Sequence, residues 1–312
     1  MSDKAAAMDV PGIEMRPASA SEYCESVLSI PGVETWWWQQ GLAPYRGFSR
    51  PFRDRDGEWW WGAKPQFAWK MDFFQPLERA PKLPRFKRLL GCQYPVVDEL
   101  VNSLVHLNVI HQLEGYGLER VASQKRRAIR KGLRHLDVIA LDPCDPQTLE
   151  QARVVWNSHV ERTGWSRVFD RPAFAHHWRP LADTAGTCVI GARDRQTGVL
   201  CAWLIARVVQ DTVYIDTIAS HTERLDHRPN DTLIFTVLHN AARSDGVRHA
   251  NYFLRSDLAP LEKFKQSLGF DSSGVPARVE VNWLAAFALR HLKPAVWRRL
   301  HGDWPPPRNG NA

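Results

Sequence analysis

The sequence predicts a mixed α/β fold with a largely antiparallel central sheet. Between residues 104 and 283, segments with the two-residue alternation of strands occur among segments with the 3.6-residue periodicity of helices. Three of the strand segments follow one another through the short turns 194–198 and 210–211, and such turns join antiparallel neighbours. This mixed order is typical of a sheet with helices packed against it.

The composition is compatible with this fold class. The chain has 312 residues, of which 44% are hydrophobic and 24% charged, and this excludes a disordered, collagen-like or coiled-coil protein. No apolar run approaches the roughly 20 residues that cross a bilayer, and the start of the chain contains no signal-peptide core. We therefore expect a cytoplasmic protein without a transmembrane segment. The five cysteines form no C-x-x-C pair and no H-E-x-x-H motif occurs, so we expect no disulfide framework and no metal.

Tryptophan marks the first third of the chain. Two triplets, 36–38 and 59–61, flank a hairpin signal at 53–57. Neighbouring side chains of a strand point to opposite faces, so either both faces are covered or one ring lines a groove for an apolar or sugar-like ligand. Prolines punctuate residues 75–95 and indicate a weak domain boundary nearby. We expect a disordered N-terminus at 1–12, a Trp-rich N-terminal half at 13–103, a main domain at 104–300 and a disordered tail at 301–312.

The main domain is expected to begin with a strand at 104–113. A helix at 118–134 follows, and then a strand at 137–141. The helix is expected because five apolar residues form a stripe along it: Leu118, Val121, Ala122, Ile129 and Leu133. Residues 146–163 form the next expected helix, again with an apolar face: Leu149, Ala152, Val155, Trp156 and Val160.

Strands and helices mix in the rest of the domain. Gly246 and Gly269 are expected to end two of the helices, because glycine adopts the left-handed conformation that closes a helix. In chain order we expect a helix at 172–182, strands at 187–192, 199–209 and 212–219, a loop at 220–229, a helix at 230–244, a strand at 249–254, a helix at 258–268, a strand at 277–283 and a basic amphipathic helix at 284–300.

The chain is basic, with a net charge of +7 and an isoelectric point near 9.3. Six of the ten residues from 125 to 134 are Lys or Arg, and a second cluster runs from 290 to 299. Basic clusters attract phosphate, so Arg126 and Arg130 are candidate contacts to a substrate or another anion. One hypothesis for the function is accordingly a nucleic-acid-binding module, for RNA in particular, built around residues 125–134.

The start of the helix expected at 230–244 is a second candidate anion site. Asn230 or Asp231 provides a cap, and Arg224, His227 and Arg228 precede it. The N–H groups and the dipole of a helix N-terminus attract negative charge. The alternative is that the cap is purely structural and the arginines are solvated.

The order of the elements and three strings in the sequence resemble the GNAT acyltransferase fold, and more specifically its FemAB-like, peptidoglycan-bridge aminoacyltransferase-like branch. The strings are KRRAIRKG at 125–132, RTGW at 162–165 and EKFKQSLGF at 262–270, the last being characteristic of the Fem branch. The resemblance covers about residues 104–283 and leaves room for a degenerate GNAT-like N-terminal half. It implies transfer of an acyl or aminoacyl group from acyl-CoA or aminoacyl-tRNA to an amine of a small molecule, amino sugar, peptide or cell-envelope acceptor.

The resemblance also implies roles for individual residues. The loop at 224–232, which ends at Thr232, matches the turn that holds the donor pyrophosphate in GNAT enzymes. It contains no glycine, and this supports a further hypothesis, a non-catalytic partner protein with the same fold. Lys265, which follows Phe264, matches the transfer centre, where a cation stabilises an oxyanion or holds the donor phosphate. Arg162 and Trp165 match as substrate contacts.

Attack by an amine requires a base, for which a carboxylate on a central strand is suited. Asp216 lies among apolar residues of the strand at 212–219, with Tyr214 and Ile218 expected on its side of the strand. A structural salt bridge is the alternative role for this carboxylate. Tyr252 is a candidate for protonating the leaving group, although buried tyrosines are common.

The helix expected at 284–300 has a basic and an apolar face. Its apolar residues fall on one side: Leu289, Leu292, Val296, Trp297 and Leu300. Its cations lie around the rest: Arg290, Lys293, Arg298 and Arg299. Such a helix either makes peripheral contact with an anionic membrane or packs its apolar stripe on the protein's own sheet.

Overall fold

The computed structural model describes residues 19–29, 49–63, 66–164, 166–182, 186–256 and 258–302. Predictions that fall on the first tryptophan triplet, on Trp165, on residues 1–12 and on residues 303–312 lie outside these ranges.

Eleven described strands form one mixed sheet in the order β1-β2-β3-β4-β11-β5-β10-β9-β8-β7-β6. Only β3·β4 and β9·β10 are parallel pairs among them, so the predicted α/β fold with a largely antiparallel sheet is confirmed. The strands are β1 (Ser49–Arg53), β2 (Trp59–Ala63), β3 (Phe67–Lys70), β4 (Gly91–Pro95), β5 (Ser103–Ile110), β6 (Leu136–Ala140), β7 (Thr187–Asp194), β8 (Leu200–Val209), β9 (Thr212–Ser220), β10 (His249–Leu254) and β11 (Asp271–Val281).

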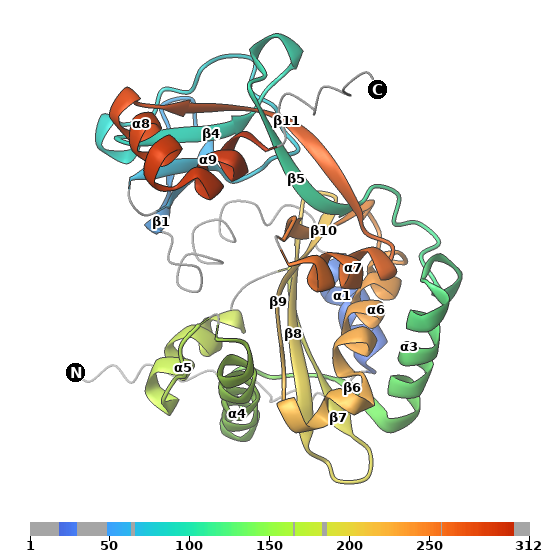
Figure 1. Ribbon diagram of the computed structural model, residues 1–312. Helices are drawn as coiled ribbons and strands as arrows, with labels where there is room; N and C mark the ends of the chain where they lie inside the picture. The colour runs from blue at the N-terminus through green and yellow to red at the C-terminus, as the bar shows by residue number, and fades with distance from the viewer. Residues whose placement is uncertain are drawn as a thin grey trace, which may run out of the picture.

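Helices cover both faces of the sheet in the lower part of the molecule (Figure 1). One face buries its apolar residues against α1 and α6, with α3 packed outside α6. The other face packs on α4 and α5, where Trp156 and Trp178 lie against Trp203 of β8. The helices are α1 (Ala20–Leu28), α3 (Ser123–His135), α4 (Pro146–Thr163), α5 (Arg171–Trp178), α6 (Pro229–Ala241), α7 (Ala259–Ser267), α8 (Trp283–Leu292) and α9 (Pro294–His301), with short 3-10 turns that include η1 (Arg85–Lys87), η3 (Leu118–Arg120) and η5 (Thr222–His227).

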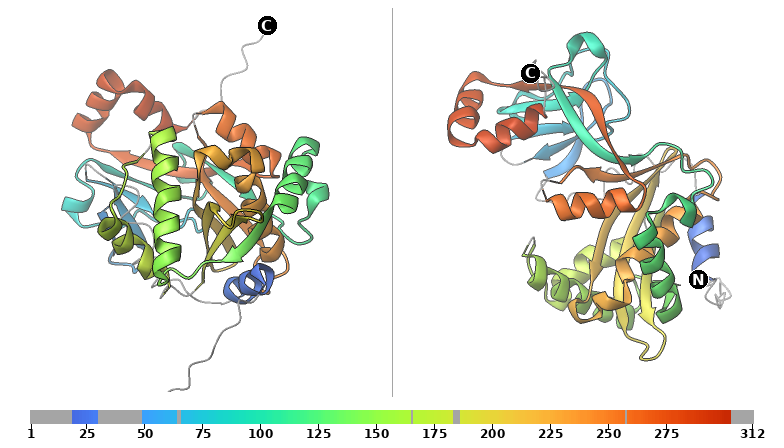
Figure 2. Two further views of the ribbon diagram at one scale, coloured as in Figure 1. Left: turned by 90° about the horizontal axis from the view of Figure 1, so that it is seen from below. Right: turned by 45° about the vertical axis from the view of Figure 1, so that its right-hand side comes forward.

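Two parts of the molecule are joined by the long curved strands β5 and β11 (Figures 1 and 2). The upper part consists of β1 to β4 together with α8 and α9. The lower part consists of β6 to β10 with α1 and α3 to α7. Residues 271–277 of β11 pair with β5, and residues 277–281 pair with β4, so this one strand links the two parts of the sheet.

The second tryptophan triplet lies in β2, where Trp60 and Trp61 are buried on opposite faces and Trp59 is half-buried. Trp60 packs edge-on against Tyr94 inside the upper part, at 6.0 Å between ring centroids. Trp61 points the other way and packs against Met71, Val209 and Tyr214, which places it on the lower part of the sheet. The hairpin signal at 53–57 is confirmed as the connection between β1 and β2.

Most predicted elements occur at or near their expected positions, but the helix expected at 118–134 is divided. A 3-10 turn, η3, ends at Arg120, and α3 begins only at Ser123. Val121 between them is extended and buried, and the N–H of Ala122 donates to the carbonyl of Ser267 at 3.1 Å. This tertiary contact with the end of α7 interrupts the helix, which the apolar periodicity does not reveal.

The C-terminal helix expected at 284–300 is two helices. Lys293 between α8 and α9 has φ −139° and ψ 60°, which is not helical. Pro294 is the cause, because proline has no N–H to donate and disfavours helical geometry in the residue before it.

The last strand also differs from the expectation, since β11 begins at Asp271 rather than at 277. Its polar first residues are held in the sheet by pairing with β5.

Strand β9 contains a β-bulge at Asp216. Ile205 of β8 pairs with Thr217, whereas its neighbour Ala206 pairs with Ile215, so Asp216 is the extra residue. Tyr214 and Ile218 consequently pack in different clusters, Tyr214 beside Trp61 and Ile218 on the α6 side. The expectation that they share one side of the strand was therefore wrong, since a bulge reverses the alternation.

Candidate functional site

Strands β9 and β10 separate after a short parallel pairing. They pair only at three positions, which end with Asn251 opposite Tyr214. Strand β9 stays paired with β8 as far as Ser220, whereas β10 continues on β5, where Leu254 lies opposite Leu107. Within the described part of the chain, no strand pairs with the β10-facing edge of residues 215–220. We call this opening the splay.

The backbone of β10 is strained where the splay begins. Phe253 has a φ of 55°, a conformation that costs a residue other than glycine of order 1–3 kcal/mol. Its N–H donates to Oδ1 of Asn251 at 2.7 Å, and the Asn251 side chain also bonds to Tyr214. Burial raises the pKa of Tyr214 well above its ordinary value, and Asp72 nearby adds to the rise, so this phenol stays neutral. The Asn251 side chain therefore links the two strands at their last paired position and fixes the turn of the β10 backbone immediately after it.

Lys265 of α7 occupies the closed end of the splay. Its ammonium donates to the carbonyls of Tyr252 at 3.1 Å and Leu254 at 3.0 Å, and it lies 5.0 Å from the centroid of the Tyr252 ring. Lys265 is only 4% exposed. It therefore replaces a strand partner for the carbonyls of β10. Two predicted catalytic residues, Tyr252 and Lys265, meet here.

Two residues that the sequence analysis missed complete this buried polar cluster. Glu262 Oε1 lies 3.5 Å from Lys265 Nζ and accepts hydrogen bonds from Asn108 Nδ2 at 3.2 Å and Ser256 N at 2.6 Å. Glu262 Oε2 and Asn108 Oδ1 are buried and have no hydrogen-bond donor among the described residues. The spacing of three between Glu262 and Lys265 on a helix was the available signal, because such residues are neighbours.

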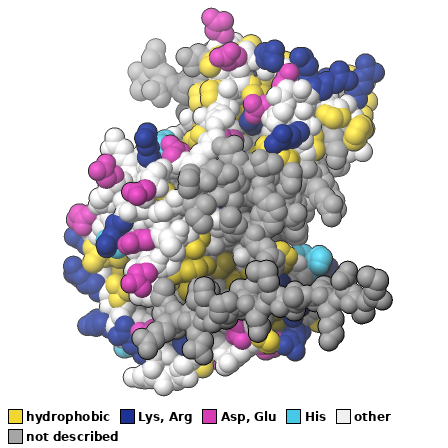
Figure 3. Space-filling view, turned by 180° about the vertical axis from the view of Figure 1, so that it is seen from behind, with side chains coloured by type: hydrophobic (Ala, Val, Ile, Leu, Met, Phe, Trp, Pro, Cys, Tyr) yellow, Lys and Arg dark blue, Asp and Glu magenta, His cyan; other side chains and the backbone are white. Residues whose placement is uncertain are grey.

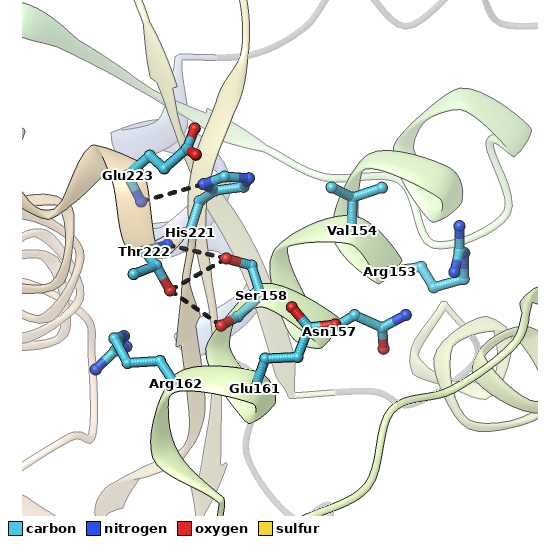
Figure 4. Close-up of a pocket in the computed structure, with 9 residues that line it drawn as sticks. All are labelled: Arg153, Val154, Asn157, Ser158, Glu161, Arg162, His221, Thr222 and Glu223. Carbon is cyan, nitrogen blue, oxygen red and sulfur yellow. Dashed lines mark hydrogen bonds between the residues drawn. The ribbon is translucent and has the colours of Figure 1, made fainter.

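A pocket of about 620 Å³ opens at the other end of β9, between α4 and the turn η5 (Figure 4). Ser158 joins the two elements, since its Oγ accepts from the N–H of Thr222 at 3.0 Å and its carbonyl accepts from Oγ1 of Thr222, also at 3.0 Å. The lining is polar and mixed in charge: Arg153, Val154, Asn157, Ser158, Glu161, Arg162, His221, Thr222 and Glu223.

Two predicted contact residues meet beside this pocket at Ser220, the last residue of β9. Arg162 Nη2 and Asn230 Nδ2 each donate to Ser220 Oγ at 3.3 Å. Arg162 is also 3.1 Å from Nδ1 of His159, which accepts from the N–H of Ser220. Burial, with the Arg162 charge as the second cause, lowers the pKa of His159 to about 4. A neutral imidazole, a guanidinium and the first turn of α6 therefore meet here, and this combination suits an anionic ligand.

Other residues of the predicted donor loop do not line the pocket. Asp231 forms an ion pair with Lys125 of α3, and Thr232 is buried against Gly132 of the same helix. Arg228 is exposed and left-handed, with φ 60°, and serves as the N-cap of α6. Arg224 is partly exposed in η5. The loop thus divides between helix packing and the region of the pocket.

His227 of the same loop belongs to a group of potential metal ligands. Its Nδ1 lies 3.0 Å from Oδ2 of Asp194, and the ligand atoms of Asp194, Cys201 and His227 all fall within 4.8 Å of one another. Burial raises the pKa of Cys201 to about 11, so its sulfur is a thiol at neutral pH rather than the thiolate that metals prefer. The expectation that the protein holds no metal stays a prediction.

Asp216, the predicted base, lies in a buried ion pair. Its Oδ2 is 3.4 Å from Nη2 of Arg207, and neither side chain is more than 1% exposed. Arg207 lies two residues after Ile205 and four after Trp203 on β8, so it shares their face of the sheet. That face packs against α4 and α5. Tyr252 packs with Phe270 on the α6 face, so Asp216 and the Lys265 cluster lie on opposite sides of the sheet. The predicted catalytic residues therefore do not form one group.

The remaining predicted contacts lie on or next to α3. Arg130 lines an open depression of about 430 Å³ with Arg127, Leu133 and Arg134, and Arg126 lies on the same helix. Phe264 of α7 packs under the ammonium of Lys125, with Nζ 4.1 Å from the ring centroid. The basic stretch is thus a surface of one helix, separate from the pocket beside Ser220.

Comparison with known proteins identifies the fold. No family model and no curated protein matches the sequence. The structure is similar to FemX, with a TM-score of 0.56 and 11% identity over 86% of this chain and 97% of that one. It is also similar to the C-terminal domain of a putative lysylphosphatidylglycerol synthetase from Agrobacterium fabrum (TM-score 0.54, 12% identity, 91% and 97% of the chains). A third similar structure is L-PGS from Bacillus licheniformis (TM-score 0.52, 13% identity, 82% and 90% of the chains). The chain therefore has a FemX-like fold, as the resemblance to the FemAB-like branch of GNAT proteins predicted.

Proposed function

We propose that the protein is a transferase that moves an acyl or aminoacyl group from a carrier to an amine acceptor. The observation that carries this proposal is the splay between β9 and β10, with a buried lysine at its closed end and Arg162, Asn230 and the start of α6 at its open end. An extended donor fits along the β10-facing edge of residues 215–220, because no described strand pairs with that edge and a strand edge offers N–H and C=O groups for hydrogen bonds. The anionic part of the carrier would lie near Arg162.

Aminoacyl-tRNA is the carrier that we favour over acyl-CoA. The loop before α6 contains no glycine, although glycine favours the close backbone approach that a CoA pyrophosphate needs. Even the left-handed position of this loop, which glycine adopts most easily, is occupied by Arg228. The exposed cations of α3 provide a surface for a polynucleotide backbone. One similar structure is named as the C-terminal domain of a putative lysylphosphatidylglycerol synthetase, so we add a lipid acceptor to the amine acceptors that the sequence suggested.

A transfer assay tests the proposal. The protein would be incubated with radiolabelled aminoacyl-tRNAs or acyl-CoAs and with amine and phosphatidylglycerol acceptors, and loss of the label from the carrier would be followed. We expect turnover with one carrier class, and a decrease in kcat/KM of roughly 10- to 100-fold in Arg162→Gln, because hydrogen bonds to a charged group contribute about 1.5–3 kcal/mol. Arg179→Gln, an exposed arginine outside the pocket, is the matched control.

RNA binding without catalysis is the second candidate function, and the cationic surface of α3 favours it. A tRNA titration at several salt concentrations should give a steep salt dependence, which Arg126→Glu/Arg130→Glu should flatten. Binding of tRNA without any turnover would assign this second function. Neither binding nor turnover with any carrier would contradict both and favour a non-catalytic partner protein.

A further inference from the structure

Helix α8 has its large apolar side chains on the outside. Trp283, Leu284 and Phe287 are 77%, 59% and 63% exposed. The small residues Ala285 and Ala286 are half-buried on the side facing the protein, and Leu289 packs against the cluster around Val279. A helix at the surface of a soluble protein normally has the reverse arrangement, with large apolar residues facing the core.

This apolar surface continues on the segment before β4. Asn282, the N-cap of α8, donates from Nδ2 to the carbonyl of Leu89 and from its N–H to the carbonyl of Leu90, so the segment lies next to the start of α8. Leu89 is 57% exposed and Phe86 is 67% exposed. We call Phe86, Leu89, Trp283, Leu284 and Phe287 together the α8 face. Isolated exposed apolar residues are ordinary, but a contiguous group from two segments indicates an interaction site.

Positive charge surrounds the α8 face. Residues 281–302 contain no Asp or Glu, and four cations there are exposed: Arg290, Lys293, Arg298 and Arg299. Arg85 is exposed in the neighbouring segment. The nearby acid, Glu280, is engaged by Arg278 at 3.2 Å and lies 4.0 Å from Arg88. Hydrophobic and cationic side chains lie next to each other at the upper right edge of Figure 3, where α8 and α9 are located.

We propose that the α8 face rests on the headgroup region of an anionic phospholipid bilayer. Tryptophan and phenylalanine would enter the boundary between headgroups and acyl chains, and the cations would contact lipid phosphates. Charge complementarity selects this occupant, because an apolar face flanked by exposed cations, with the nearby acid Glu280 already engaged by arginines, is matched by an apolar layer below a plane of negative charge. No helix among the described residues has the length and apolarity to cross a membrane. The contact is therefore one of docking on the surface.

The residues differ from those that the amphipathic pattern of 284–300 suggested. Leu300 is only 9% exposed and packs with Phe67 and Val279, and Leu289 joins the same cluster. Part of the predicted apolar stripe therefore packs on the protein itself, which was the alternative to membrane contact for this stripe. The membrane-facing arc is the opposite one, which begins with Trp283.

Vesicle co-sedimentation of the full chain tests the proposal. The vesicles would be phosphatidylcholine alone, and phosphatidylcholine mixed with phosphatidylglycerol or with phosphatidylserine. We expect binding to both anionic mixtures, weakening with salt, and little binding to phosphatidylcholine alone. Trp283→Ser/Phe287→Ser and Lys293→Glu/Arg298→Glu should each lower the partition coefficient at least tenfold. The control Val168→Ser/Val199→Ser removes two exposed apolar side chains elsewhere and should leave binding unchanged.

Three results would overturn the proposal. They are no binding to either anionic mixture at low salt, equal loss of binding in the control variant, or a dimer in light scattering that Trp283→Ser/Phe287→Ser converts to a monomer. The last result would identify the α8 face as an interface between copies of the chain. All substituted side chains are exposed, so the variants should fold, and circular dichroism melting would verify this. The assay contains no carrier or acceptor turnover, and its outcome is therefore separate from that of the transfer assay.

Discussion

At the scale of single residues, Lys265 has the clearest energetic role. Its ammonium is the hydrogen-bond donor for the carbonyls of Tyr252 and Leu254 and the cation beside Glu262. Lys265→Met would leave these acceptors buried without it, and removal of one partner from a buried charged group typically costs about 3–5 kcal/mol. We expect a decrease of this size in the free energy of unfolding, measured by urea denaturation.

Lys263 offers the matched control on the same helix. It is exposed, and Lys263→Met should change the free energy of unfolding by no more than about 0.5 kcal/mol. If the two variants unfolded at the same urea concentration, the lysine would not support β10, and its burial would need another explanation.

His159 makes a prediction about pH. Burial and the neighbouring Arg162 lower its pKa to about 4, against an ordinary value near 6.5 in the unfolded chain. Between these two values the unfolded state binds more protons than the folded state, so this residue makes the protein less stable as the pH falls from about 6.5 to about 4 and has no such effect above that range. His159→Gln should flatten the fall in stability within this window.

An NMR titration checks the same residue directly. The ring resonance of His159, assigned by its absence from His159→Gln, should keep its neutral position at pH 5. A midpoint near 6.5 would contradict the prediction, and it would mean that the imidazole beside Ser220 is open to solvent.

At the scale of elements, the contact between α3 and α6 depends on Gly132. A Cβ atom placed on Gly132 would lie 1.9 Å from Oγ1 of Thr232 and 3.2 Å from the carbonyl of His227. Gly132→Ala improves the helix propensity of α3 by about 1 kcal/mol, but it forces the two helices apart. We expect a net destabilisation of about 1–3 kcal/mol, as found when buried sites are overfilled.

A second substitution separates this clash from other effects. Gly132→Ala/Thr232→Ala removes the nearest atom and should recover part of the loss, with Thr232→Ala alone as the control. Thermal denaturation of the set measures the coupling between the two positions. Additive effects would show that the helices do not meet as closely as the structure has them.

At the scale of the whole molecule, β11 makes the upper and lower parts one structure. Ala277 pairs with both Pro95 of β4 and Ser103 of β5, and it is fully buried. A sheet that is continuous through this strand cannot lose one part without exposing the edge of the other. We expect both parts to unfold together, so amides of β4 and of β10 should exchange hydrogen with the same global opening free energy.

Native-state hydrogen exchange in increasing urea measures this cooperativity. A lower opening free energy for β4 than for β10 would contradict the prediction, and it would support the division into an N-terminal half and a main domain near residue 103. The domain boundary stays a prediction until such a measurement is made.

The sequence by itself determined the local elements of this protein. Periodicity and turn residues were sufficient for α4, for β10 and for the hairpins of β7 to β9, because a strand or helix that buries one face shows it in the spacing of its apolar residues. The order of the elements, together with the strings at 125–132, 162–165 and 262–270, was sufficient to predict a GNAT fold of the FemAB-like branch. Lys265 and Tyr252 were named from the sequence as separate catalytic candidates, and the structure brings these two together.

Tertiary structure alone decided the rest. The bulge at Asp216, the extended residue Val121 and the early start of β11 are imposed by partners that lie far away in the chain, and no local pattern contains them. The same holds for Glu262 and Asn108, which join the Lys265 cluster from α7 and β5. Asp216 and Lys265 lie on opposite sides of the sheet, and Trp283 points outward from α8. Both placements depend on which face of the sheet or helix packs against the core. That choice is made by packing of the whole chain and not by any one segment.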